Sequence, residues 1–165
     1  MRPAGRALSL SALCILMALP ASAGRAQASS IAATGTWSAS VGSNDLQAGA
    51  GSDLQASCES PAGQVALTIM GTASPTAAWQ VDVQRNDILW PQGLSLSVLR
   101  AGDGLGPGSI SGGTGYQSIT SIPTAFFSGQ GDRSGISLQL KIGGLSVRVP
   151  PGAYSTTITY TVIDQ

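Results

Sequence analysis

The sequence predicts an all-β protein, a single antiparallel β-sandwich of the immunoglobulin-like or jelly-roll type. Apolar residues recur at every second position along several segments, which is the period of a half-buried strand. No later segment shows the period of an amphipathic helix, and 22 glycines and 9 prolines among 165 residues interrupt the chain too often for ordinary helices. The pattern gives about eight to ten short strands, which suit two packed sheets, with a closed barrel as the main rival.

The N-terminal residues are arranged like a secretory signal peptide. Two arginines precede an apolar run from Ala7 to Leu19, and the small residues Ala21–Ala23 follow it as a cleavage site. The run is shorter than the roughly 20 apolar residues that a bilayer-spanning helix needs. We therefore expect a signal peptide over residues 1–23 and one β-sandwich domain over residues 24–165. The mature domain is expected to be secreted, periplasmic or at a bacterial cell surface, with no membrane span.

Three segments in the first half of the domain are predicted strands with one buried face. In residues 65–69, 79–83 and 94–98, apolar side chains occupy alternate positions, and smaller or polar residues stand between them. Turn-forming Gly, Pro, Asn and Asp residues separate these segments. Such alternation places one face of each strand on a core and the other face in solvent.

The segment 101–115 is so rich in glycine that we expect a long surface loop, with a short strand around Ser109–Ser111. Its run Gly102–Gly108 superficially looks like a phosphate-binding loop. However, no Lys followed by Ser or Thr comes after it and no helix is predicted there, so the pattern does not indicate a nucleotide site. Long loops on a rigid β-scaffold commonly bind ligands, so a binding site would be expected here first.

A β-hairpin is predicted around Gly143–Gly144. Ile136–Ile142 and Leu145–Val149 both alternate, and a two-residue Gly-Gly loop favours the tight turn of a hairpin. In that register Leu140 faces Val147, and one face of the ribbon is wholly apolar.

The C-terminal segment from Tyr154 to Ile163 is predicted to be a strand of the core. Two prolines and a glycine at 150–152 end the preceding segment, because proline cannot donate to a strand ladder. Tyr, Thr, Ile, Tyr and Val then occupy alternate positions, and hydroxyl residues fill most of the opposite face. We expect this segment to be ordered, although chain ends often fray.

The chain offers few residues for catalytic chemistry. It contains no histidine, and Glu59 is its one glutamate, so a serine nucleophile lacks its usual base and a glycosidase lacks an obvious acid pair. Asp87, Asp103 and Asp132 lie in predicted turns, but no segment has carboxylates at the spacing of a calcium loop. We therefore expect a protein that is not an enzyme, with no catalytic residues, no cofactor site and no metal site.

Charge and cysteine content narrow the range of partners. Of eight basic residues, two lie in the leader, which leaves six basic against eight acidic residues, a balance that disfavours nucleic acid as a partner. Cys58 is the one cysteine after the leader, so an intramolecular disulfide is excluded. We expect a buried core cysteine, with an intermolecular bridge as the alternative.

The three tryptophans are predicted to be core residues rather than a platform for sugars. Trp79 shares the apolar face of its strand, Trp37 lies on an apolar alternation, and Trp90 precedes a proline at a strand boundary. Burial is the common state of such positions, whereas a sugar platform needs exposed rings.

The C-terminal sequence Pro150-Pro-Gly-Ala-Tyr-Ser-Thr-Thr-Ile-Thr-Tyr-Thr-Val162 resembles the closing strand of bacterial pilin-like β-sandwiches. In particular it is similar to subunits of the spore coat protein U type, which are associated with chaperone and usher assembly. The resemblance implies an incomplete immunoglobulin-like sandwich whose missing strand comes from an N-terminal extension of the neighbouring subunit. Ile31–Val41 alternates as such a donor strand should, or as the domain's own first strand. Such subunits commonly carry a disulfide, which a single mature cysteine forbids here.

These observations favour a non-catalytic exported structural or adhesive β-domain, such as a subunit of a surface fibre or coat. Its partners would be further copies or surface proteins, reached through strand addition. The alternative is a carbohydrate- or ligand-binding module that uses the Gly-rich loop 101–115. A subunit should assemble with itself, whereas a binding module should stay monomeric until it meets its ligand.

Overall fold

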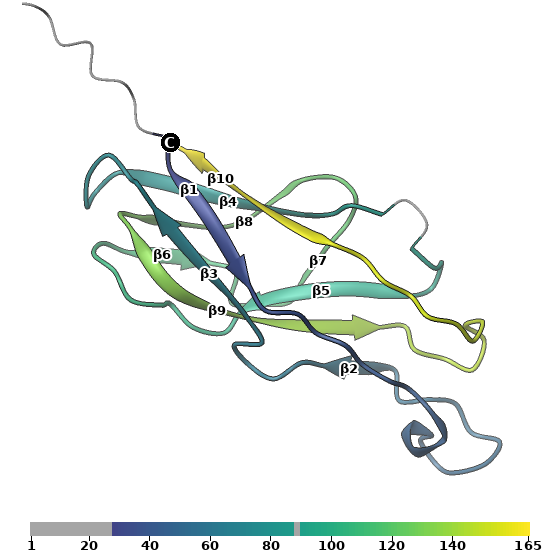
Figure 1. Cartoon of the computed structure of the whole chain (residues 1–165). Helices are drawn as coiled ribbons and strands as arrows, with labels where there is room; N and C mark the ends of the chain where they lie inside the picture. The colour runs from purple at the N-terminus through teal and green to yellow at the C-terminus, as the bar shows by residue number, and fades with distance from the viewer. Residues whose placement is uncertain (1–27, 88–89) are drawn as a thin grey trace, which may run out of the picture.

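The fold is an antiparallel β-sandwich, in a computed structural model that describes residues 28–87 and 90–165. Strands far apart in the sequence pair into two sheets that pack face to face (Figure 1). The six-stranded sheet contains, in order, β1 (Ser30–Thr34), β3 (Val65–Met70), β9 (Arg133–Gly143), β5 (Ser95–Arg100) and β7 (Gln117–Ser118), with β2 (Ser57–Glu59) also paired to β9. The four-stranded sheet contains, in order, β10 (Ile158–Asp164), β4 (Ala78–Arg85), β8 (Thr124–Gln130) and β6 (Ile110–Gly112). The predicted sandwich is confirmed. The barrel alternative is wrong, since no described strand pairs with a strand of the other sheet.

Trp79 on β4 organises the interior between the sheets. Its side chain is fully buried, its ring meets Phe127 edge-on with centroids 6.0 Å apart, and its indole N–H donates to the Gly131 carbonyl at 2.8 Å. Gly129 faces the indole at a point where a Cβ atom would come within 2.5 Å of the ring. The rest of the core comes largely from alternate positions of β3, β4, β5 and β9. The three predicted strands of the first half are thus confirmed, although the third begins at Ser95.

The hairpin predicted around Gly143–Gly144 is wrong. The predicted strand Ile136–Ile142 lies within β9, which runs on to Gly143, but residues 145–149 form no strand. Leu140 lies opposite Val98 of β5 and is buried, whereas Val147 is 61% exposed. The apolar alternation of 145–149 therefore does not face the core in the way that the pattern predicted.

Long-range pairing overrides the local turn preference at this point. β9 already has β5 along one edge and β3 and β2 along the other, so no edge remains for a hairpin partner. Gly144 has φ +74° and passes so close to the Gly93 carbonyl that a Cβ atom would collide with it. The next turn is fixed by Asp53, whose carboxylate accepts the Val147 N–H at 2.9 Å.

β10 confirms the predicted C-terminal strand from Ile158 onward but not its first residues. Ile158, Tyr160 and Val162 pack against the core on the face that the alternation predicted. Tyr154 is instead 43% exposed, and its hydroxyl donates to the Pro150 carbonyl at 2.6 Å. The proline-rich turn therefore continues beyond Tyr154 before the chain reaches β4.

β1 is the domain's own first strand in this structure. It pairs antiparallel with β3, from Ser30 opposite Met70 to Thr34 opposite Ala66. The strand ends at Gly35, where φ is +109° and the chain crosses so close to Gln64 that a Cβ atom would collide with the carbonyl. Within β1, Ile31 alone is half-buried and the other residues are exposed.

Three further sequence expectations concern the leader, a membrane span and Cys58. The predicted signal peptide over 1–23 lies outside the described residues. Within the described ranges, no helix is long and apolar enough to cross a membrane. Cys58 is half-buried and unpaired there, so the prediction of a fully buried core cysteine is wrong. The reason is its place on β2, a three-residue strand that pairs on one side only, with β9.

Candidate functional site

β10 forms a lateral edge of the four-stranded sheet. It pairs with β4 along its whole length, from Ile158 opposite Arg85 to Asp164 opposite Trp79. Among the described residues, no strand pairs with its other side. The free side is therefore an open strand edge on the surface of the sandwich.

The register fixes where the main-chain groups of β10 point. The Asn86 N–H donates to the Thr157 carbonyl, and the Gln165 N–H donates to the Ala78 carbonyl, which marks hydrogen-bonded pairs just before and just after the strand. Such pairs recur at every second residue of an antiparallel ladder. The odd-numbered residues of β10 therefore point their main-chain N–H and C=O groups toward β4. The even-numbered residues direct their N–H and C=O groups outward along the free edge: Ile158, Tyr160, Val162 and Asp164.

Little protects this edge from a further strand. The sequence of β10, ITYTVID, contains no proline, lysine or arginine, which are residues that natural edge strands use against pairing. At one end, the Ser29 N–H donates to the Asp164 carboxylate at 3.1 Å, and hydrogen bonds from Ser29 hold the pKa of Asp164 below its ordinary value. From that contact β1 and β10 diverge, as Figure 1 shows. Within the part of the chain that the structure describes, the edge is thus covered at its C-terminal end and open along the rest.

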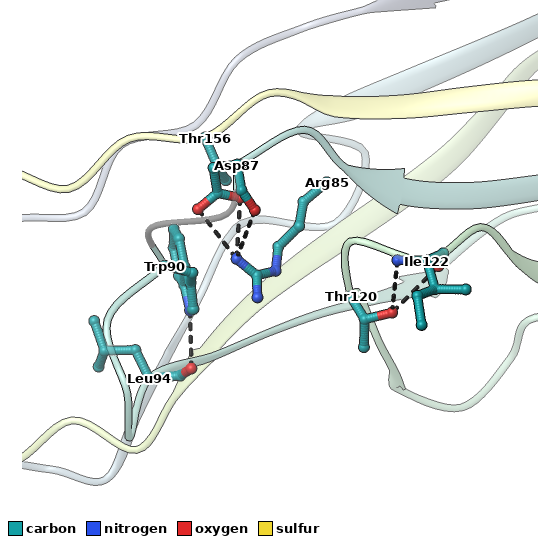
Figure 2. A network of polar contacts seen from close by, with 7 residues as sticks. All are labelled: Arg85, Asp87, Trp90, Leu94, Thr120, Ile122 and Thr156. Carbon is teal, nitrogen blue, oxygen red and sulfur yellow. Dashed lines mark hydrogen bonds and ion pairs between the residues drawn. The ribbon is translucent and has the colours of Figure 1, made fainter.

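A polar network holds the chain that leads into β10 against the end of β4 (Figure 2). Arg85 donates to both carboxylate oxygens of Asp87, at 3.0 and 3.1 Å. The Thr156 hydroxyl donates to Asp87 at 2.7 Å. The Arg85 guanidinium also lies 5.4 Å from the ring centroid of Trp90, whose indole N–H donates to the Leu94 carbonyl at 2.8 Å. These contacts join the start of the C-terminal segment to the chain on both sides of 88–89.

Asp87 acts in this network as an ionised acceptor. Burial raises its pKa, but the hydrogen bonds from Thr156 and Arg85, together with the Arg85 charge, lower it more, so the net pKa lies below its ordinary value. Asn86 adds a bond from its side-chain amide to the Thr159 hydroxyl at 2.8 Å. The network positions β10 through side chains and leaves its outward main-chain groups unused.

Hydrogen bonds hold the Gly-rich segment 101–115 against the sandwich. The buried guanidinium of Arg133 donates to three carbonyls of the segment, at 2.7 to 3.2 Å. Leu105 and Ser134 exchange main-chain hydrogen bonds, both at 2.8 Å, while the Leu105 side chain is 80% exposed. The short strand predicted within the segment is confirmed as β6, at Ile110–Gly112.

A shallow pocket of about 320 Å³ opens on the outer face of the four-stranded sheet, where β6 of this segment lies beside β8. That volume is at the low end of the range for small-molecule sites. The pocket lies over β4, β8 and β6, and its polar side chains are Gln80, Ser109, Ser111, Ser128, Gln130 and Gln165. A second hollow shares Gln80, Ser111 and Ser128 with it and extends along the same face.

The carboxylates of the predicted turns do not converge on one place. Three carboxylates form ion pairs at separate points: Asp87 with Arg85, Asp103 with Arg100, and Glu59 with Lys141. Asp132 accepts hydrogen bonds from the main chain and the hydroxyl of Thr72 instead. In residues 28–87 and 90–165, no group of three or more His, Cys, Asp or Glu side chains could hold a metal ion.

The tryptophans offer no exposed ring next to the pocket. The core assignment is confirmed for Trp79, which is fully buried. Trp37 and Trp90 are half-buried and pack against the same core. A ligand in the pocket would therefore meet amides and hydroxyls rather than an aromatic face.

No protein-family model, curated protein or solved structure matches this sequence. What is shown is therefore the antiparallel β-sandwich, and the kinship with pilin-like subunits stays a hypothesis.

The sequence predicts the C-terminal strand and the Gly-rich loop 101–115, but it does not predict the open edge or the pocket. Alternation marks Gln80 as facing outward, yet it does not indicate that β8 brings Gln130 close to it.

Proposed function

We propose that this protein is a non-catalytic, exported structural or adhesive domain that works as a subunit of a surface fibre or coat. The open edge of β10 carries the proposal. A strand edge that is unpaired and has no proline, lysine or arginine is a template for another strand. In the assembly, a strand of a second copy adds to Ile158–Asp164 and extends the four-stranded sheet.

The chemistry of the edge supports strand addition by a second copy. Four residues direct main-chain donors and acceptors outward. The side chains of Ile158, Tyr160 and Val162 pack against the core, whereas those of Thr161, Ile163 and Asp164 are exposed. The outward main-chain groups are therefore available to a strand that adds beside β10.

The test is assembly of the processed chain. Size-exclusion chromatography with light scattering, followed by electron microscopy, should show species that grow with protein concentration. Val162→Pro removes one outward N–H and places a ring on the edge, while leaving the bonds to β4 intact. It should weaken the association constant at least about tenfold, which corresponds to about 1.4 kcal/mol.

A second variant keeps the test valid if Val162→Pro folds poorly. Thr161→Lys puts a charge on the exposed face of the edge strand, opposite Asp82, and should also suppress assembly. Gln84→Lys is the matched control, because Gln84 shares that face but lies on β4, one strand inward. A wild-type chain that stays monomeric at millimolar concentration, or variants that assemble as the wild type does, would overturn the proposal.

The second candidate function is a carbohydrate- or ligand-binding module that uses the segment 101–115. The observation that favours it is the pocket, two of whose serines, Ser109 and Ser111, come from this segment. Such a module would stay monomeric until a ligand binds, and its elution would change only then. The two functions are therefore separated by the same chromatography run with and without a saccharide.

A further inference from the structure

We infer that the pocket over β4, β6 and β8 binds a neutral polyhydroxylated ligand, a saccharide or polyol. The inference rests on the second candidate function and names its site and ligand class. It starts from the lining, whose side-chain polar groups are three amides and three hydroxyls without a charged side chain. A site for a phosphate or carboxylate ligand would need cationic donors, which this lining lacks.

The two central glutamines offer opposite hydrogen-bonding groups. The Gln80 amide nitrogen donates to Asp82 at 2.7 Å, which fixes the amide and leaves its Oε1 as an acceptor. The Gln130 Oε1 accepts from the Ser109 hydroxyl at 3.4 Å, which leaves the Gln130 Nε2 as a donor. No other hydrogen bond of the described residues occupies these two atoms.

A pair of hydroxyls lies beside the glutamines and completes the pattern. Ser111 and Ser128 are 3.2 Å apart at Oγ, and either can donate to the other. Their register on neighbouring strands holds them together, with Gln80 opposite Ser128 on the other side. The pocket thus presents an acceptor, a donor and reorienting hydroxyls, with no charged side chain in its lining. Hydroxyl groups of a sugar both donate and accept, so they match such a mixture better than a purely donating or accepting ligand does.

The site lacks the aromatic ring that tight sugar binding commonly uses, so binding is expected to be weak for a single ligand. The polar rim also continues into the second hollow, which shares three of these side chains. An oligosaccharide is therefore a better fit than a monosaccharide.

The test is a titration of the ¹⁵N-labelled processed chain with maltotriose, xylotriose and chitotriose, followed by amide chemical shifts. At least one trisaccharide should give saturable shifts at Gln80, Ser128 and Gln130. Gln130→Leu should weaken this binding about three- to tenfold, the loss expected for one or two neutral hydrogen bonds. Gln84→Leu, on the same face of β4 but outside the pocket, should change it less than about twofold.

The alternatives give different outcomes. Shifts confined to residues 101–108 would overturn the pocket assignment but keep the second candidate function. Tighter binding of inorganic phosphate or glucuronate than of the neutral sugars would overturn the ligand class. No saturable shift with any probe at tens of millimolar would overturn both the inference and the second candidate function, while the assembly proposal would be unaffected.

Discussion

The two lateral sides of the sandwich are built differently. On one side the chain passes from β6 in one sheet to β7 in the other, and Arg100 binds this crossing through its main-chain N–H to Gly113 and its side chain to Gly112. On the other side, β1 and β10 come from opposite ends of the domain and lie near each other. A hydrogen bond from the Ser29 N–H to the Asp164 carboxylate joins them near one end. The first side is closed by covalent continuity and a buried guanidinium, whereas the second side is left open by the residues that the structure describes.

The difference shows how an edge is protected. β6 and β7 have three and two residues, and positive φ angles at Gly112 and Gly113 turn the chain away before a long edge can form. β10 has seven residues without a glycine or proline. Short, bent strands discourage pairing, and long regular ones permit it. The open side is therefore where strand addition is expected.

Deleting Thr157–Gln165 should have the largest effect. The deletion removes β10 with three side chains that pack against the core and exposes the edge of β4. Burial of one such side chain contributes about 1.5–3 kcal/mol, a large share of a typical stability of about 5–15 kcal/mol. The truncated chain should be unfolded or aggregated by circular dichroism and light scattering. A soluble product with a cooperative melt near the full-length temperature would show that β10 is peripheral.

Leu140→Ala should destabilise the centre of the six-stranded sheet by about 2–5 kcal/mol. Leu140 is buried on β9, between β5 and the strands on the other side. Val147→Ala should cost less than about 0.5 kcal/mol, because that side chain is mostly exposed. Urea unfolding measures both values. Equal losses would support the hairpin that the sequence predicted and contradict the pairing of β9 described above.

The failed hairpin shows where local sequence stops being informative. Alternation placed Leu138, Leu140 and Trp79 correctly in the core, because the period of two depends on a single strand and its buried face. The predicted turn at Gly143–Gly144 rests on local chemistry alone, whereas the observed pairing of β9 depends on β3 and β5, which are distant in sequence. The open edge and the pocket have the same character, since both depend on which strands become neighbours.

Arg100→Met should weaken the closed side by about 1–3 kcal/mol. The buried Arg100 side chain donates to the Gly112 carbonyl at 2.9 Å, and methionine leaves that carbonyl without its donor. Burial and the neighbouring Arg133 lower the pKa of Arg100, so part of the loss is offset when the charge is removed. Thermal melting should show the loss, and chromatography should show new association if the crossing opens. An unchanged melting temperature would contradict the assigned role of Arg100 in closing this side.

Asp87→Asn should weaken the open side by about 1 kcal/mol at neutral pH. The folded pKa of Asp87 lies below its unfolded value, so the carboxylate stabilises the fold fully above the unfolded pKa of about 3.9 and loses this effect as the pH falls through the folded pKa. The wild type should therefore be more stable than the variant at pH 7, and the gap should close in acid. Urea unfolding from pH 2 to pH 7 measures the gap. A gap independent of pH would contradict the ionised role of Asp87.

Hydrogen exchange along β10 tests the central claim most directly. In dilute monomer, the inward amides of Thr159, Thr161 and Ile163 should exchange slowly, because they are bonded to β4. The outward amides should exchange quickly, and at high protein concentration they should become protected as a second copy adds its strand: Ile158, Tyr160, Val162 and Asp164. An alternating pattern that turns uniform on concentration is the predicted result. Outward amides that are already protected in the monomer, or that stay unprotected in assembled protein, would contradict the account.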